Sequence, residues 1–254
     1  MTRRRWIADT STDTTASLLG AQAEHLARVL RAQPGIEADI VVNGHVYHAS
    51  IASVSTEEVA FNLIEELSSE PALPITLLLS VFKFDRMEWA IEKATELGVA
   101  TIVPIIARRT EKHLAQAADK RVDRWRRIAQ EAAKQSRRAD LPVIEDPVAL
   151  ATRLQRPSTA QHILLAENEL DITLRQRIEA ALTASGSELP NIEIAIGPEG
   201  GWTNEELALF QKHNWQSASL GPRILRAETA AIASLAIVSA LLQTSHTPQP
   251  FSSP

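Results

Sequence analysis

The chain of 254 residues contains no cysteine, which excludes disulfide bridges, thiol nucleophiles and thiolate metal sites together. No apolar run is long enough to cross a bilayer, and the arginines at positions 3–5 are not followed by the apolar segment of a signal peptide. The seven histidines show no ligand spacing, so we expect no bound metal. The lack of cysteine and of a signal peptide fits a cytoplasmic protein, which is what we expect.

The chain has fewer Lys and Arg than Asp and Glu, with a net charge of −5, but its basic residues are unevenly distributed. Residues 1–70 hold five Lys and Arg against ten Asp and Glu, whereas residues 108–138 hold eleven against four. A basic segment of this kind attracts a phosphate backbone. The same pattern is typical of a solvated helix face, so charge alone leaves RNA binding open.

The pattern of apolar residues changes near residue 72 and predicts two domains. Residues 1–72 are rich in β-prone segments, with a hairpin expected at Asn43-Gly44 and a short helix over 21–31. In residues 73–243 apolar strands alternate with helices, which predicts an α/β fold with a mostly parallel sheet. The Pro-rich tail, 244–254, is expected to be disordered.

Five strands and five helices are expected in the second domain. The last helix is apolar almost all round, which predicts that it is buried. The expected strands cover 75–82, 99–106, 162–166, 192–196 and 217–220, and the expected helices cover 85–97, 119–138, 171–185, 203–213 and 228–243.

Three segments carry candidate chemistry, and the first is Ile196-Gly197-Pro198-Glu199-Gly200-Gly201-Trp202-Thr203. It follows an apolar strand, and its glycines let a ligand approach the backbone closely. Thr203 and Glu206 have the spacing of a capping box, which would fasten the loop to the start of a helix. A glycine-rich turn without a ligand is the alternative interpretation, because such loops are weakly specific.

The second segment, residues 220–231, again joins a short strand to an apolar helix. Glu228 and Thr229 suit the start of a helix, where the dipole favours negative charge and a cap. Arg223 and Arg226 do not, because cations are unfavourable at that end. We therefore interpret these two arginines as contacts to a ligand or to RNA.

The third segment, residues 83–98, has the same strand-to-helix form. Asp85 is a candidate N-cap, and Lys83 and Arg86 are either surface charges or phosphate contacts. Trp125 lies in the arginine-rich segment that follows and has helical spacing with its apolar neighbours. That spacing predicts a core position for Trp125.

Together these segments resemble the RsmE family, whose members are S-adenosylmethionine-dependent uridine N3-methyltransferases of bacterial small-subunit (16S) ribosomal RNA. The resemblance covers residues 3–243, and its two glycine-proline segments are highly specific in this order and spacing. Phe84 departs from the family, which commonly has glycine there. Further resembling residues are Glu24-His25-Leu26, Val29-Leu30-Arg31, Met87, Lys93, Glu96 and Trp125 to Arg138.

The resemblance implies the SPOUT class, with a PUA-like RNA-binding β-barrel in residues 1–72 and a trefoil knot in residues 73–243. It also implies a homodimer, with the final helix in the interface, and S-adenosylmethionine bound among three loops. The residues that it assigns to this cofactor are Leu165, Ala166, Glu167, Gly197, Pro198, Glu199, Gly200, Gly201, Leu220, Gly221, Ile224, Leu225 and Arg226.

Methylation at N3 requires loss of the N3 hydrogen, because neutral uracil is a poor nucleophile there. Glu199 and Glu228 are both candidates for the base, and Arg226 is the candidate that stabilises the resulting anion. The sequence does not choose between the two carboxylates. The candidate RNA contacts are Arg3, Arg5, Arg31, Lys83, Arg86, Lys93, Arg109, Arg137, Arg138 and Arg223.

Two other functions stay open at this point. A knotted methyltransferase of transfer RNA or large-subunit ribosomal RNA would keep every cofactor residue and differ in its target alone. A non-enzymatic RNA-binding assembly factor would lack affinity for the cofactor. Methylation assays on isolated ribosomal subunits and on transfer RNA separate the first alternative, and cofactor binding separates the second.

The basic stretch predicts that the affinity of the protein for RNA falls steeply with added salt. Each neutralised phosphate contributes about −0.9 to the slope of log K against log salt concentration on duplexes, and about −0.7 on single strands. Titrations of ribosomal RNA at several salt concentrations measure this slope. A slope near zero would show that residues 108–138 are an ordinary solvated face.

Overall fold

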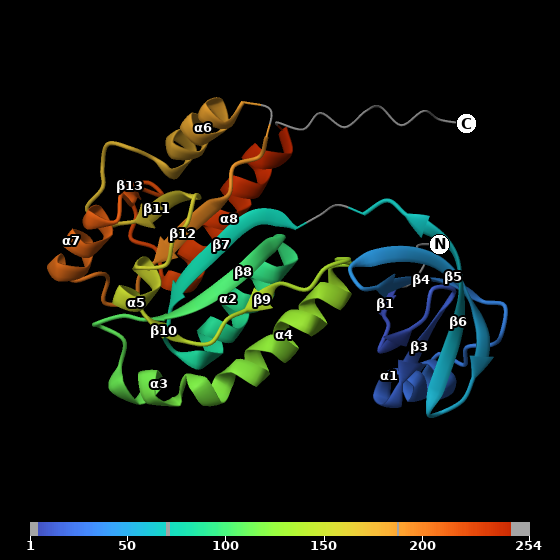
Figure 1. Ribbon diagram of the computed structural model, residues 1–254. Coiled ribbons are helices and arrows are strands. Elements are labelled where there is room, and N and C mark those ends of the chain that lie inside the picture. Colours follow the sequence, from blue (N-terminus) through green and yellow to red (C-terminus); the bar gives the residue numbers. More distant parts are fainter. Residues whose placement is uncertain (1–4, 70–71, 187, 245–254) are drawn as a thin grey trace. The chain divides into compact units, whose positions relative to one another are not determined.

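The computed structural model of the protein describes residues 5–69, 72–186 and 188–244 and divides the chain into two compact units (Figure 1). The first unit contains the described residues of 1–71 together with 133–141, and the second contains those of 72–132 and 142–254. Each unit has its own sheet and its own hydrophobic core.

The first unit is built on a six-stranded sheet with the order β1-β4-β5-β6-β3-β2, in which only the β1–β4 pair is parallel. Leu18, Ile40 and Phe61 fill its core, and Ala139 packs beside Val41. Its strands are β1 (Arg5–Ile7), β2 (Thr10–Ser11), β3 (Thr15–Leu19), β4 (Glu37–Val42), β5 (His45–Val54) and β6 (Glu58–Leu67).

The hairpin expected at Asn43-Gly44 is confirmed, because both residues have the positive φ of a type I′ turn, 50° and 87°. The helix expected over 21–31 is wrong in its extent. Helix α1 covers Gly20–Glu24, and His25–Val29 forms a single π-helical turn. Arg31 then ends the segment, because its φ of 49° is left-handed and cannot continue a right-handed helix.

The second unit is an α/β layer structure around a seven-stranded parallel sheet with the order β10-β8-β7-β12-β11-β13, where β9 pairs beside β8. The expected α/β class is therefore confirmed. The strands are β7 (Leu73–Ser80), β8 (Val99–Ile106), β9 (Val143–Ile144), β10 (Val148–Ala149), β11 (Gln161–Leu165), β12 (Ile192–Ile196) and β13 (Gln216–Ala218). The helices are α2 (Phe84–Glu96), α3 (Lys112–Ala117), α4 (Val122–Gln135), α5 (Leu150–Leu154), α6 (Leu174–Ser185), α7 (Asn204–Lys212) and α8 (Ala227–Thr244), with a 3₁₀ turn at Asp119–Arg121.

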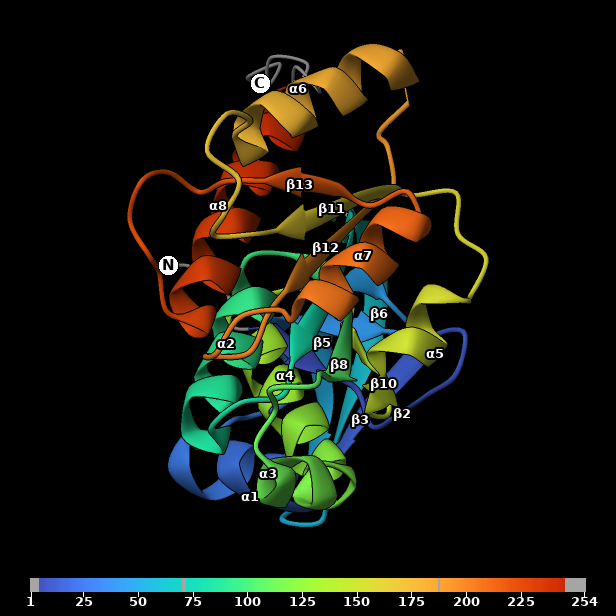
Figure 2. The ribbon, with the colours of Figure 1, turned by 90° about the vertical axis from the view of Figure 1, so that its left-hand side faces the viewer.

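Helices cover both faces of this parallel sheet, so its strands are apolar on both sides. Leu77 and Leu79 of β7 belong to the core cluster that includes α2, α6 and α8, whereas Leu78 belongs to the cluster with α5 and α7. Figure 2 shows α2 and α8 on one side of the sheet and α5 and α7 on the other. Trp125 is fully buried in the first cluster, which confirms the position expected from its spacing.

The helix expected over 119–138 is interrupted at both ends. It begins as the 3₁₀ turn, and α4 ends at Gln135. Arg137 has a left-handed φ of 59°, and the Arg138 amide donates to the Ala133 carbonyl at 2.9 Å. The chain thus leaves the helix before Ala139, which is buried in the core of the first unit.

The last helix, which was expected to be buried, is buried within this chain on one side only. In α8, Ala231, Leu235 and Val238 are buried, but Ala236 and Ala240 are exposed, because α2, α6 and the sheet pack against one side only. Within the described residues no helix is long and apolar enough to cross a membrane. The tail expected to be disordered lies outside the described residues, apart from the last residue of α8.

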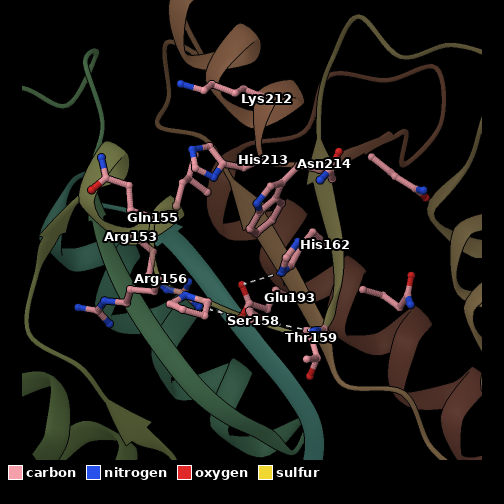
Figure 3. A pocket seen from close by; sticks show the side chains of 16 residues that line it. Arg153, Gln155, Arg156, Ser158, Thr159, His162, Glu193, Lys212, His213 and Asn214 are labelled. Carbon is pink, nitrogen blue, oxygen red and sulfur yellow. Dashed lines mark hydrogen bonds and ion pairs between the residues drawn. The ribbon is translucent and has the colours of Figure 1, made fainter.

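A buried ion pair stands at the amino ends of β11 and β12, beside a polar cavity of about 500 Å³ (Figure 3). Arg153 Nη2 donates to Glu193 Oε1 at 2.8 Å, and the Ser158 hydroxyl donates to the same oxygen at 3.0 Å. His162 Nε2 lies 3.8 Å from Glu193 Oε2, and its ring stacks on Trp215 with centroids 4.9 Å apart. Burial lowers the pKa of His162, which favours the neutral form of its ring.

Removing one partner of this pair should destabilise the fold strongly. Arg153→Ala leaves a buried carboxylate without its cation, which costs about 3–5 kcal/mol in the free energy of unfolding. Arg156→Ala is the matched control, because Arg156 pairs with Glu145 at 2.6 Å but its side chain is 47% exposed, so its loss should cost less than about 1 kcal/mol. Urea unfolding measures both variants, and equal losses would contradict the expected role of the buried pair.

Candidate functional site

Three loops meet where parallel strands of the second unit end, at their carboxyl ends. We call this end of the sheet the carboxyl edge. They follow β11 (residues 165–167), β12 (residues 197–201) and β13 (residues 219–226), three strands that are neighbours in the sheet. The Ala166 amide donates to the Ala218 carbonyl at 3.2 Å, which ties the first loop to the last residue of β13, where the third loop begins. The structure therefore places the residues expected to bind the cofactor at one edge, where open α/β sheets bind ligands.

The loop after β12 is a tight turn. The Gly201 amide donates to the Pro198 carbonyl at 2.8 Å, and Gly201 has a φ of 69°, which disfavours other residues. A Cβ atom on Gly197 would lie 3.2 Å from the ring of Trp202. Part of the glycine content is thus explained by packing within the protein, whereas Glu199 and Gly200 are exposed at the tip of the turn.

Glu206 holds this turn on the start of α7. Its Oε2 accepts from the Thr203 amide at 2.9 Å and the Thr203 hydroxyl accepts from the Glu206 amide at 3.3 Å, which is the expected capping box. Its Oε1 accepts from the Arg108 amide at 2.8 Å. Arg109 adds a second tie, because its guanidinium donates to the Gly200 carbonyl. The loop after β8 is thereby fastened to the loop after β12.

The loop after β13 presents polar and apolar side chains to solvent. Gly221 has a φ of 110°, and its amide donates to the Ser219 hydroxyl at 3.1 Å. Arg226 is exposed, and the side chain of Ile224 is 80% exposed. An exposed isoleucine beside a glycine turn suits contact with a flat apolar surface of a ligand.

An arginine joins the loop after β12 and the start of α8 to the start of α2. Arg86 Nη1 donates to Glu199 Oε1 at 2.8 Å, and Arg86 Nε lies 3.7 Å from Glu228 Oε1. The side chain of Glu228 is 7% exposed, whereas those of Arg86 and Glu199 are 31% and 32% exposed. The two carboxylates expected as alternative bases thus share one guanidinium.

The candidate RNA contacts are found in different environments. Lys93 lies between Glu92 and Glu96, at 2.8 and 2.7 Å, and hydrogen bonds to these carboxylates raise its pKa. Arg86 and Arg109 hold the loops described above. Arg138 forms an ion pair with Asp140, and Arg5 donates to the Arg137 carbonyl. Arg3 lies outside the described residues. The remaining candidates are exposed: Arg31, Lys83, Arg137 and Arg223.

Phe84, the departure from the expected glycine, packs in the core behind this edge. Its ring meets Trp125 edge-on with centroids 6.1 Å apart, and the Arg121 guanidinium lies 4.7 Å from its centroid. Arg124 Nε and Nη2 donate to the Glu88 carboxylate at 2.6 and 2.8 Å. These contacts fix the start of α2, and with it Arg86.

The cavities near the opposite, amino edge of the sheet are not lined by any residue of the three loops. The Glu193 carboxylate lines both cavities, but it is already paired with Arg153. The buried charge in these cavities therefore needs no ligand to balance it. In the described residues no three His, Asp or Glu side chains are grouped to hold a metal ion. The carboxyl edge is therefore the better candidate site.

Sequence reasoning missed the ties between loops. Glu206 was expected only to cap α7, and Arg109 only to contact RNA. Their partners are 98 and 91 positions away along the chain, and no local pattern signals contacts at that separation.

The sequence is similar to those of other proteins over most of its length. Residues 69–239 match the family of RNA methyltransferase domains. The chain is 34% identical over 237 residues to the Ribosomal RNA small subunit methyltransferase E of Synechocystis sp., covering 91% of this chain and 75% of that protein. It is 33% identical over 235 residues to the protein of the same name from Bacillus subtilis, covering 89% of this chain and 90% of that one.

Solved structures share the fold. The Ribosomal RNA small subunit methyltransferase E from Neisseria gonorrhoeae bound to S-adenosyl methionine matches with a TM-score of 0.80 at 27% identity, covering 94% of this chain and 98% of that chain. A putative methyltransferase from Legionella pneumophila in complex with the same cofactor matches with a TM-score of 0.79 at 27% identity, covering 95% and 98%.

Glu206→Ala should destabilise the protein more than an ordinary cap mutation. It removes the acceptors of two amides, those of Thr203 and Arg108, and we expect a loss of about 2–3 kcal/mol in the free energy of unfolding. Gln176→Ala is the matched control, since Gln176 occupies the same capping-box position on α6 and accepts from the Thr173 amide at 2.8 Å. Its loss should be about 1 kcal/mol. Equal losses in chemical unfolding would show that the tie to Arg108 contributes nothing.

Proposed function

This chain belongs to the ribosomal RNA small subunit methyltransferase E family, and from that membership we propose that it methylates N3 of a uridine in 16S ribosomal RNA as a cytoplasmic homodimer. It is an S-adenosylmethionine-dependent methyltransferase of small-subunit ribosomal RNA. The names of its relatives support the activity, and the cofactor bound in two similar solved structures supports the methyl donor. The observation that carries the site assignment is the meeting of three loops at the carboxyl ends of β11, β12 and β13.

The residues of this edge fit S-adenosylmethionine. Ile224 and Leu225 offer apolar surface to the adenine ring, and the turns at Gly201 and Gly221 let peptide groups approach its edge. When bound, the cofactor supplies a methyl group on a sulfonium sulfur. The residues that would hold it are Leu165, Ala166, Glu167, Gly197, Pro198, Glu199, Gly200, Gly201, Leu220, Gly221, Ile224, Leu225 and Arg226.

The chain's own residues must deal with the N3 proton of the uridine. Bond formation between N3 and the methyl carbon, with loss of the carbon–sulfur bond, requires that proton to pass to a base. Glu199 and Glu228 are the two candidate bases at this edge, and we assign exposed Arg226 to the stabilisation of negative charge on the pyrimidine. Holding the two reactants side by side supplies a further part of the rate.

The path of the chain in the second unit supports a knotted SPOUT domain over residues 73–243. Strand β13 lies at one edge of the sheet beside β11, yet the helix that follows it, α8, packs against α2 and contacts β7 and β12. After β13 the chain therefore passes back over β11 and β12 to reach β7. The sheet of the first unit, with α1 against it, supports a PUA-like barrel over residues 1–72 that binds RNA.

The exposed side of α8 supports a homodimer. Ala236 and Ala240 are exposed, and Ala233 and Ile237 are half-buried, on a helix that has no charged residue after Glu228. Small apolar residues along an unpaired helix face allow close packing against a second helix, and burying that face removes apolar surface from water.

Methyl transfer from radiolabelled S-adenosylmethionine to small ribosomal subunits, taken from cells that lack this protein, tests the function. We expect label on N3-methyluridine, identified by mass after digestion. Glu199→Gln and Arg226→Ala should each lower kcat by about 100-fold, because proton transfer and charge stabilisation contribute that much.

Unchanged turnover in Glu199→Gln, Glu228→Gln and Arg226→Ala, each with full cofactor binding, would overturn the residue assignment. Label on transfer RNA or large subunits would move the target to another RNA. Absence of cofactor binding by the unmutated protein would favour an assembly factor.

A further inference from the structure

Arg86 occupies an unfavourable place for an isolated cation. It is the third residue of α2, in the first helical turn, where the helix dipole repels positive charge. Its side chain is only 31% exposed, and its guanidinium is turned to Glu199 and is not extended into solvent toward an RNA phosphate. A cation in this position requires a compensating interaction, and the structure shows two carboxylates around it.

The two carboxylates differ in burial and therefore in what they can contact. The Glu228 side chain is 7% exposed, and its Oε2 is enclosed and accepts no hydrogen bond from the described part of the chain. Burial of an ionised carboxylate is costly unless a cation or hydrogen-bond donors compensate it, and Arg86 Nε lies 3.7 Å from its other oxygen. Glu199 is 32% exposed, so one side of its carboxylate is open to a ligand.

The guanidinium is the group that suits both partners at once. Its Nε points toward Glu228 on α8, and its Nη1 donates to Glu199 on the loop after β12. A planar fork offers these donors in fixed directions, whereas a lysine ammonium is a single point charge on a flexible stem. Arg86 therefore links three elements that are far apart in the sequence.

We propose that Arg86 is a positioning residue for methyl transfer: Glu228 anchors it, and it holds Glu199 so that Glu199 is the carboxylate that meets the target uridine. This inference rests on the proposed function. It replaces the interpretation of Arg86 as an RNA phosphate contact, and it decides between the two candidate bases by their exposure. Glu228 acts through Arg86 and does not contact the substrate.

Steady-state kinetics on small ribosomal subunits test this role. Arg86→Ala should lower kcat by about 100-fold, because a misplaced carboxylate loses the orientation that the reaction needs. The KM for the subunits and the Kd for S-adenosylmethionine should change by less than about 3-fold, because the residue contacts neither directly. Arg86→Lys should recover part of kcat, since it keeps the charge but loses the fork.

A double-mutant cycle gives the sharper measurement. Glu199→Gln should cost little further activity in the Arg86→Ala background, because the two residues act as one unit. Glu228→Gln should lower kcat by removing the anchor, and its effect should likewise vanish in the Arg86→Ala background. Arg175→Ala is the control, since Arg175 forms an exposed ion pair with Glu179 at 2.7 Å on α6, and it should leave kcat unchanged.

A rise in KM, together with a salt slope reduced by about 1 and an unchanged kcat, would overturn the proposal and make Arg86 a phosphate contact. Full additivity of Arg86→Ala and Glu199→Gln would also overturn it. The proposed function is tested separately by the unmutated protein: if it transfers no methyl group to any RNA, that function fails. The coupling of Arg86, Glu199 and Glu228 is then still measured by non-additive shifts in Tm.

Discussion

The complete burial of strand β12 is the constraint on which the rest of the site depends. All five of its residues are buried, and it pairs with β7 on one side and with β11 on the other. A strand paired on both edges and packed on both faces cannot shift easily. A slip by one residue would disrupt the packing on both faces and would move the buried Glu193 away from Arg153. The turn that follows at Gly197 therefore starts from a fixed point, and so do the hydrogen bonds of Glu206 and Arg109.

Buried carboxylates lie at both ends of this apolar sheet, and at each end an arginine is paired with the carboxylate. At the amino end, Glu193 is matched by Arg153 and by the Ser158 hydroxyl. At the carboxyl end, Glu228 is matched by Arg86, which also reaches the exposed Glu199. The first group is closed on itself, whereas the second leaves a carboxylate facing solvent beside the glycine turns. That difference favours the carboxyl end as the candidate site for chemistry, whereas the matched charges of the amino end stabilise the fold.

The basic stretch illustrates how tertiary structure changes the meaning of a sequence pattern. Residues 108–138 carry a clear excess of Lys and Arg, yet they are divided between the two units, because 133–141 belong to the first. Within the second unit, Arg124 binds Glu88 and Arg126 binds Asp146. Part of the positive charge is therefore used to fix α2 and the loop before β10, and a count of charges along the chain does not reveal this.

Local features of this protein were determined by its sequence alone. The Asn43-Gly44 hairpin, the capping box of Thr203 and Glu206, and the strands over 99–106 and 192–196 follow from φ preferences, three-residue spacing and runs of apolar residues. The family could also be inferred from two glycine-proline segments. Tertiary structure alone decided that α8 keeps an exposed face, that α4 stops at Gln135, and that Arg86 stands between Glu199 and Glu228. The bonded pair Arg86 and Glu199 is 113 positions apart, and a charge partner at that distance is selected by how the strands pack, which no local spacing encodes.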